Sequence, residues 1–179
     1  DAAVLFDVIR GTDLRDQTTV EATHVDYRFP MHLKGVRIGL PRQAWGGGMK
    51  SEVRAHVEEG VDLLRGLGAD VKEVDLPYAD EALSVYYILM PCEVSANLSR
   101  LDGIRYGSRA HASTLIETYA QSREEGFGEE VRRRILLGTF ALSKGYYDAY
   151  YRQAKKVQTL ICRAYQKAFE EVDLLVTPT

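Results

Sequence analysis

Cysteine and histidine are scarce in this 179-residue sequence, and their spacing argues against several kinds of site. The two cysteines, Cys92 and Cys162, lie outside any CxxC motif, which argues against a disulfide framework and favours a reduced, intracellular chain. The histidines show no HxxxH or HExxH spacing, so structural zinc is not expected. We interpret all four as surface or loop residues: His24, His32, His56 and His111.

Long apolar runs and an excess of basic charge are also missing. No segment approaches the roughly 18 apolar residues of a membrane-spanning helix, and no signal peptide is present. A formal net charge of -3 gives no reason to expect tight binding to a phosphate backbone by this chain alone. The composition, 45% hydrophobic and 27% charged, is that of an ordinary globular chain. We therefore predict a cytoplasmic protein without a membrane partner.

Common catalytic and phosphate-binding motifs are absent as well. The sequence has no GxSxG elbow, no GxxxxGKS/T loop and no GxGxxG motif after a strand. Its one glycine run, 46–48 (GGG), lies between an expected strand and an expected helix. Backbone N–H groups of such a turn can cradle a phosphate, or the turn can be a plain flexible connection. Because no lysine and hydroxyl stand in register, we favour the connection.

Hydrophobic periodicity predicts one α/β domain whose second half is rich in helices. Residues 36–76 should form a strand–helix–strand unit with parallel strands, and Ser51 should be the N-cap of its helix. Residues 80–171 form the helical portion, in which Pro91 should kink the first helix or split it in two. Residues 173–179 are expected to form a core strand with partners on both sides.

Both ends of the sequence suggest a piece of a larger fold. Residues 1–10 have the apolar spacing of the last turns of a helix that stops at Gly11. A polar stretch without clear periodicity follows at 12–35, which is unusually long for a loop inside a compact domain. We expect a segment of a longer protein, in which this stretch is either a functional excursion or packs against something outside the sequence.

Two clusters of charged or aromatic residues are candidates for binding. Arg134 directly precedes the apolar run 135–137 and so lies at the edge of a buried helix face. An arginine in that place is either ion-paired or snorkelling, or it binds a ligand. The run 146–151 (YYDAYY) places four tyrosines at the start of a helix. They either pack in the core with hydrogen-bonded hydroxyls or present stacking faces to a ligand.

Longer strings in the second half of the sequence indicate a family. They comprise 97–107 (NLSRLDGIRYG), 125–135 (EGFGEEVRRRI), 138–143 (GTFALS), 145–151 (GYYDAYY) and the closing 175–179 (LVTPT). Together with the earlier unit, they resemble the A subunits of glutamine-hydrolysing glutamyl-tRNA(Gln) amidotransferases, which are amidase-signature enzymes. The resemblance covers almost the whole chain.

The resemblance implies a mixed sheet flanked by helices and hydrolysis of glutamine by a Ser-cis-Ser-Lys triad. The released ammonia is channelled to a partner in a heterotrimer, in which the B and C subunits accompany the glutaminase. That partner uses ATP and Mg to amidate Glu-tRNA(Gln). None of the three triad residues has a counterpart in this chain. We therefore expect the parent protein to be an amidotransferase of the ligase class, and the isolated chain to be inactive and to need no cofactor of its own.

Two site residues follow from the resemblance, and both belong to the glutamine pocket. Tyr86 resembles the tyrosine that contacts bound glutamine, and Arg134 resembles the arginine that holds the charged α-carbon end of the substrate. An acidic pocket residue of the family would lie beyond Thr179. Four further motif residues receive no role, and ion pairs that tie the helix to the following loop are the plain alternative: Glu93, Asn97, Arg100 and Arg105.

Two other functions remain as alternatives. The chain could belong to an amidase-signature hydrolase that acts on a different amide. It could also be a non-catalytic module whose irregular stretch and helical surface pack against partner subunits.

Overall fold

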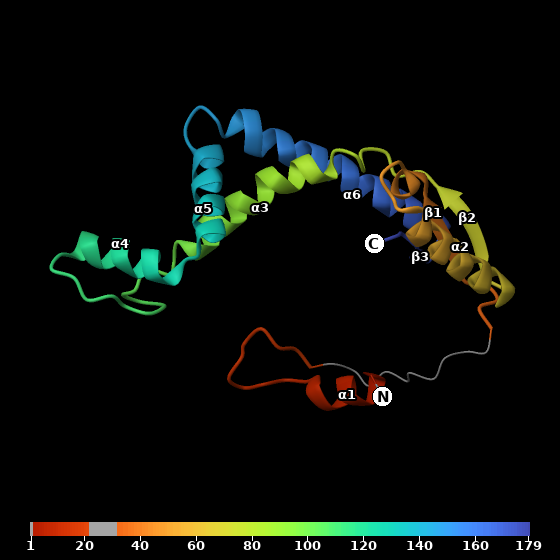
Figure 1. The fold of residues 1–179 in the computed structure, drawn as a ribbon, viewed down its shortest axis with the longest axis horizontal. Coiled ribbons are helices and arrows are strands. Elements are labelled where there is room, and N and C mark those ends of the chain that lie inside the picture. Colours follow the sequence, from red (N-terminus) through yellow and green to blue (C-terminus); the bar gives the residue numbers. More distant parts are fainter. Residues whose placement is uncertain (1, 22–31) are drawn as a thin grey trace.

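The computed structural model describes residues 2–21 and 32–179 of the chain. His24 and the middle of the polar stretch lie outside these residues. The described elements alternate between strands and helices up to residue 74 and are almost entirely helical afterwards (Figure 1). The predicted α/β class and the helix-rich second half are therefore confirmed. In chain order the elements are α1 (Ala2–Ile9), β1 (Arg37–Pro41), η1 (Arg42–Trp45), α2 (Ser51–Gly66), β2 (Asp70–Val74), α3 (Ala82–Leu98), α4 (Leu115–Gly126), α5 (Glu129–Leu142), the π-helix η2 (Asp148–Arg152), α6 (Gln153–Glu171) and β3 (Leu174–Leu175).

The predicted strand–helix–strand unit is confirmed as β1, α2 and β2. The two strands pair in parallel, with Ile38 opposite Val71. Lys50, not Ser51, is the N-cap of α2, so the predicted start of the helix is wrong by one residue. At the other end Gly68 has a φ of +95°, and the N–H groups of Gly68 and Ala69 bond back to carbonyls of the last turn. This arrangement is a Schellman motif, which explains why the helix stops there.

A third strand, β3, completes a small parallel sheet in the order β2-β1-β3. Arg37 ties the segment before β3 to β1, because its guanidinium donates to Asp173 at 2.6 Å and its carbonyl accepts from the Asp173 N–H at 2.8 Å. The strand has only two residues and pairs with β1 alone among the described residues, whereas we expected a strand over 173–179 with partners on both sides. Leu174 is half-exposed at this edge.

The second half of the chain is built on α3, which packs against both α5 and α6 (Figure 1). Its contact with α6 is apolar and centres on Val85, Leu89 and Ala154, all buried. At its contact with α5 the two backbones almost touch. A Cβ atom placed on Gly138 of α5 would lie only 1.9 Å from the carbonyl oxygen of Pro91. Gly138 therefore sets the distance between these two helices.

Pro91 lies inside α3, which continues through it, so the prediction that this proline splits the helix in two is wrong. Proline removes one backbone hydrogen bond from a helix and disfavours the preceding turn. The helix nevertheless continues from Ala82 to Leu98, because packing on α5 and α6 holds both of its halves. Pro91 itself is fully buried in this packing.

Candidate functional site

The candidate site lies where α5 crosses α3, and its central residue is Arg134. Helix α5 begins after Gly128, and its first turn carries Glu129 and Glu130, which suit the positive end of the helix dipole. Arg134 follows one turn later and has a side chain only 30% exposed, whereas the side chain of its neighbour Arg133 is 69% exposed. The helix therefore turns Arg134 toward α3 and Arg133 toward solvent.

The structure brings together the two residues that the sequence analysis assigned to the glutamine pocket. Nη1 of Arg134 donates a hydrogen bond to the hydroxyl of Tyr86, which is 48 residues earlier in the chain, at 3.3 Å. The same nitrogen contacts the sulfur of Met90, one helical turn beyond Tyr86, at 3.5 Å. Tyr86 is half-exposed, so it is not enclosed between the two helices. A guanidinium beside a phenol hydroxyl can bind a carboxylate.

Glu130 completes the cluster from within α5. Its carboxylate accepts from Nε of Arg134 at 2.7 Å and from Nε of Arg133 at 2.8 Å. The Tyr86 hydrogen bond, followed by that of Glu130, raises the pKa of Arg134. The Arg134 and Arg133 hydrogen bonds lower the pKa of Glu130, so the carboxylate stays ionised at neutral pH. Arg134 is thus ion-paired, as one of the two interpretations expected, and still has its Nη2 without a hydrogen-bond partner among the described residues.

The motif residues that the sequence analysis left without a role have mostly local partners. The Asn97 amide donates to the Glu93 carbonyl at 2.9 Å, and Arg100 donates to the carbonyl and side chain of Asn97, both at 2.9 Å. Glu93 also accepts from the Tyr151 hydroxyl at 3.5 Å, which links α3 to η2. Of these residues, only Arg105 forms an ion pair within the part of the chain that the structure describes, with Asp102 at 3.2 Å. These contacts stabilise the end of α3 and the loop after it.

Asp102 organises that loop, a role that the sequence analysis missed. Its side chain is almost buried and accepts from the backbone N–H groups of Ile104 and Arg105, both at 2.9 Å. These two bonds, more than the Arg105 guanidinium, hold the pKa of Asp102 well below its usual range. The pattern Asp-Gly at the start of the turn is a signal for this geometry, since Gly103 has a φ of +73°.

We expect Asp102→Ala to lower the melting temperature by several degrees, because the backbone N–H groups of Ile104 and Arg105 lose an acceptor whose own side chain is buried. Asp16→Ala is the matched control, since Asp16 makes a similar turn with Thr18 but is exposed, and it should change the melting temperature little. The pKa of the Asp102 carboxyl is lower in the folded protein than in the unfolded chain, where it is 3.8. The ionised carboxylate therefore stabilises the folded state at pH values above 3.8. The difference between wild type and Asp102→Ala should therefore shrink as the pH falls below about 3.8. An equal effect of both substitutions would contradict this account.

The tyrosine run follows the predicted core packing at one of its four rings. Tyr151 packs against the apolar cluster of α3 and α6, as the core interpretation expected. The other three are 42–44% exposed, so for them that interpretation is wrong. Tyr147 stacks on Tyr151 with ring centroids 5.2 Å apart, and Tyr146 stacks on Tyr150 at 6.0 Å. The four tyrosines thus form two stacked pairs around the start of the π-helix η2.

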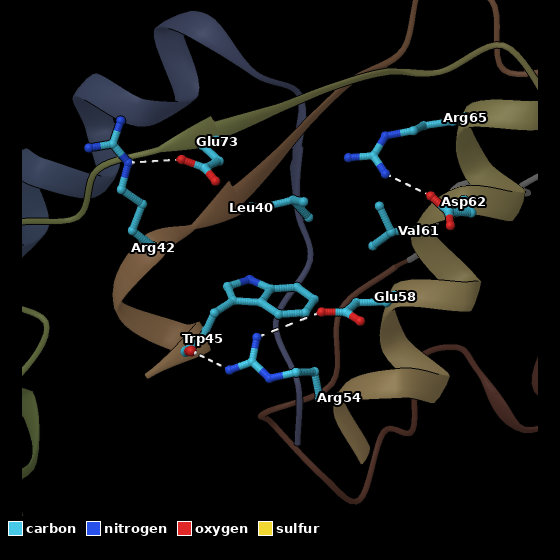
Figure 2. Close-up of a pocket in the computed structure, with 9 residues that line it drawn as sticks. All are labelled: Leu40, Arg42, Trp45, Arg54, Glu58, Val61, Asp62, Arg65 and Glu73. Carbon is cyan, nitrogen blue, oxygen red and sulfur yellow. Dashed lines mark hydrogen bonds and ion pairs between the residues drawn. The ribbon is translucent and has the colours of Figure 1, made fainter. Parts of the chain in front are cut away.

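A hollow of about 540 Å³ in the first half of the chain also escaped the sequence analysis (Figure 2). It lies beside β1, η1 and α2, and Trp45 and Arg54 form part of its wall. Arg54 donates to the Trp45 carbonyl at 2.7 Å and lies 5.9 Å from the centre of its indole ring. The arginines of the hollow each face a carboxylate, in the pairs Arg42–Glu73, Arg54–Glu58 and Arg65–Asp62 (Figure 2). Each positive charge in the wall of the hollow is therefore already neutralised by a carboxylate of the same wall.

Two searches of the described residues concern metals and membranes. In that part of the chain, no three His, Cys, Asp or Glu side chains gather in a way that would hold a metal ion. None of the helices described there combines the length and the apolar character needed to cross a membrane.

Comparison with known proteins places these features in a family. The amidase family model matches residues 1–179. The A subunit of glutamyl-tRNA(Gln) amidotransferase from Chloroflexus aggregans is 50% identical to this chain and the corresponding protein from Roseiflexus is 48% identical, each over 181 residues. Each match covers 100% of this chain but 37% of the relative, so the chain spans little more than a third of the length of these relatives.

Solved structures show the same fold. The A subunit of glutamyl-tRNA(Gln) amidotransferase from Thermotoga maritima superposes with a TM-score of 0.61 and 32% identity, over 99% of this chain and 34% of that one. A bacterial aryl acylamidase of the amidase signature family superposes with a TM-score of 0.60 at 18% identity, over 99% of this chain and 35% of that one. The family resemblance found in the sequence is confirmed.

Proposed function

The chain belongs to the amidase family, and from that premise we propose that it forms the α-carboxylate side of a glutamine pocket in the glutamine-hydrolysing subunit of a tRNA-dependent amidotransferase. The observation that carries the proposal is the contact between Arg134 and Tyr86. The proposal is supported by 48–50% identity, over the whole chain, to relatives named as the A subunit of glutamyl-tRNA(Gln) amidotransferase.

The chemistry of the site suits free glutamine. Free glutamine carries an α-carboxylate, which a planar guanidinium can grip through two charge-assisted hydrogen bonds. The Tyr86 hydroxyl accepts from Arg134, so its own hydrogen can be donated to the same carboxylate. A glutamine within a peptide lacks that carboxylate, and the site would leave Arg134 without its ligand. The pair thus selects for the free amino acid.

The proposal extends to the complete enzyme. Its nucleophile is a serine of a Ser-cis-Ser-Lys triad, which this chain does not supply, and the pocket of this chain holds the glutamine for that serine. The ammonia released passes to partner subunits B and C in a cytoplasmic heterotrimer, which uses ATP and Mg to convert Glu-tRNA(Gln) to Gln-tRNA(Gln). This chain binds neither ATP nor Mg itself.

The proposed function is tested by measuring ammonia release from glutamine. We expect the full-length gene product to release ammonia above the buffer control, and residues 1–179 alone to release none. Hydrolysis by residues 1–179 alone would contradict the assignment of the nucleophile to another part of the enzyme. A full-length gene product that hydrolyses simple amides but not glutamine would favour an amidase that acts on a different substrate.

Contact with a partner is a second function that the structure supports. Helices α4 and α5 expose large apolar side chains, among them Ile116 (80% exposed) and Leu136 (71% exposed). Large apolar side chains that are this exposed favour burial against another surface. Cross-linking of the reconstituted complex should place α4 or α5 within reach of a partner subunit. A cross-link map in which neither helix is joined to a partner would contradict this role.

A further inference from the structure

The guanidinium of Arg134 has two edges that can grip a carboxylate, one formed by Nε and Nη2 and the other by Nη1 and Nη2. Glu130 holds Nε at 2.7 Å and so occupies the first edge. At the second edge, Nη1 has only the longer contacts to Tyr86, at 3.3 Å, and to Met90, at 3.5 Å, among the described residues. A thioether is a weak acceptor, so a carboxylate can replace it at little cost. The Nη1 and Nη2 edge is therefore the one that a ligand would use.

We propose that Glu130 is a positioning residue, which fixes Arg134 so that this second edge and the Tyr86 hydroxyl face the α-carboxylate of glutamine together. The proposal rests on the proposed function, because it concerns the same pocket. Glu130 acts through Arg134 and does not contact the substrate.

The position of Glu130 in the helix supports this role. It precedes Arg134 by four residues, the spacing at which an acidic and a basic side chain meet on one face of a helix. An arginine side chain without such a partner has many rotamers of similar energy, and ordering it on binding weakens the affinity. The bond at Nε removes most of that freedom before the substrate arrives.

The charge of the cluster is compatible with binding an anion. A carboxylate beside Arg134 would cancel its positive charge if the two were alone. The second oxygen of Glu130, however, accepts from Arg133, and this arginine faces solvent. The three side chains of Glu130, Arg133 and Arg134 together keep a net charge of +1. Glu130 can therefore orient Arg134 without making the site repel a carboxylate.

The test compares two substitutions of Glu130 in the full-length gene product with two substrates. Glu130→Ala removes the acceptor for Nε, whereas Glu130→Gln keeps an amide oxygen in its place. The substrates are glutamine and 4-aminobutanamide, which is glutamine without its α-carboxylate. We expect Glu130→Ala to raise the KM for glutamine about 5- to 10-fold, the effect of one lost hydrogen bond, with kcat within about twofold. Glu130→Gln should stay within about twofold of wild type.

The second substrate separates positioning from a purely structural role. Glu130→Ala should leave the KM for 4-aminobutanamide unchanged, since that molecule has no carboxylate to position. An equal rise with both substrates would overturn the proposal, because it would show general damage to the pocket. An unchanged KM for glutamine would overturn it as well.

Arg134→Gln, measured in parallel, separates the failure of this inference from the failure of the proposed function. If Arg134→Gln raises the KM for glutamine and Glu130→Ala does not, only the positioning role of Glu130 is wrong. If neither substitution changes the KM, the glutamine pocket itself is wrongly assigned.

Discussion

Replacing Arg134 by glutamine should raise the KM of the full-length gene product for glutamine roughly 10- to 100-fold, the range expected when a carboxylate loses charge-assisted hydrogen bonds. Arg134 lies at the crossing of α3 and α5, where its guanidinium already contacts Tyr86. The α-carboxylate is remote from the amide that reacts, so the loss should fall on binding and kcat should change less than KM. Steady-state rates of ammonia release over a range of glutamine concentrations measure both constants.

Arg133→Gln is the matched control for this prediction. Arg133 is the same residue type on the same helix and bonds to the same carboxylate, but its side chain is 69% exposed. Its charge offsets that of Glu130, but because it faces solvent its attraction to the substrate is screened by water and salt, so the KM should rise by no more than about twofold. Equal effects of the two substitutions would show that only the net charge of α5 matters. An unchanged KM in Arg134→Gln would favour an amidase whose substrate has no carboxylate.

Local elements of the fold could be predicted because their signals lie close together in the sequence. The alternation of apolar residues predicted β1, and apolar residues three and four apart predicted α2 between two parallel strands. The end of α2 also has a local cause, because Gly68 adopts a left-handed conformation that glycine reaches without steric cost. Helix starts were less certain: the predicted cap at Ser51 belongs to Lys50.

Features that depend on tertiary packing were missed or only half predicted. Pro91 predicted a kink or a break, and the break is wrong because a helix held by neighbours on both sides continues through the proline. The tyrosine run was expected either to pack in the core or to present stacking faces to a ligand, and the structure packs only Tyr151 against the apolar cluster and leaves the other three rings half-exposed. The Asp102 turn had a readable signal in its Asp-Gly pair, but the burial of Asp102 depends on the loop folding against α4.

The prediction that Tyr86 and Arg134 belong to one site did not come from local sequence signals. The two residues are 48 positions apart, and no periodicity links them. Sequence chemistry alone allowed two interpretations of Arg134, and only the family resemblance joined it to Tyr86. The structure adds what neither source contained, which is the bond from Arg134 to Glu130 and hence the choice of guanidinium edge.

The packing of α3 on α5 leads to the largest expected effect on stability. Gly138→Ala would place a methyl group 1.9 Å from the Pro91 carbonyl oxygen and 2.4 Å from its carbon, which is closer than any non-bonded contact. Both atoms belong to the backbone, so no side-chain rotation can relieve the overlap, and the helices must move apart. We expect a loss of about 3 kcal/mol or more in the free energy of unfolding. Urea denaturation of the full-length gene product, followed by circular dichroism, measures this loss.

Gly60→Ala is the matched control, because Gly60 lies inside α2 and a Cβ placed there meets nothing within 4 Å. Alanine favours a helix over glycine, so this substitution should stabilise the protein by up to about 1 kcal/mol. The same substitution, glycine to alanine, should thus raise the free energy of unfolding in α2 and lower it in α5. Separation of α3 from α5 would also move Tyr86 away from Arg134, so Gly138→Ala should raise the KM for glutamine while Gly60→Ala leaves it unchanged. A Gly138→Ala protein as stable as wild type would contradict the close approach of the two helices, and with it the geometry on which the pairing of Tyr86 with Arg134 depends.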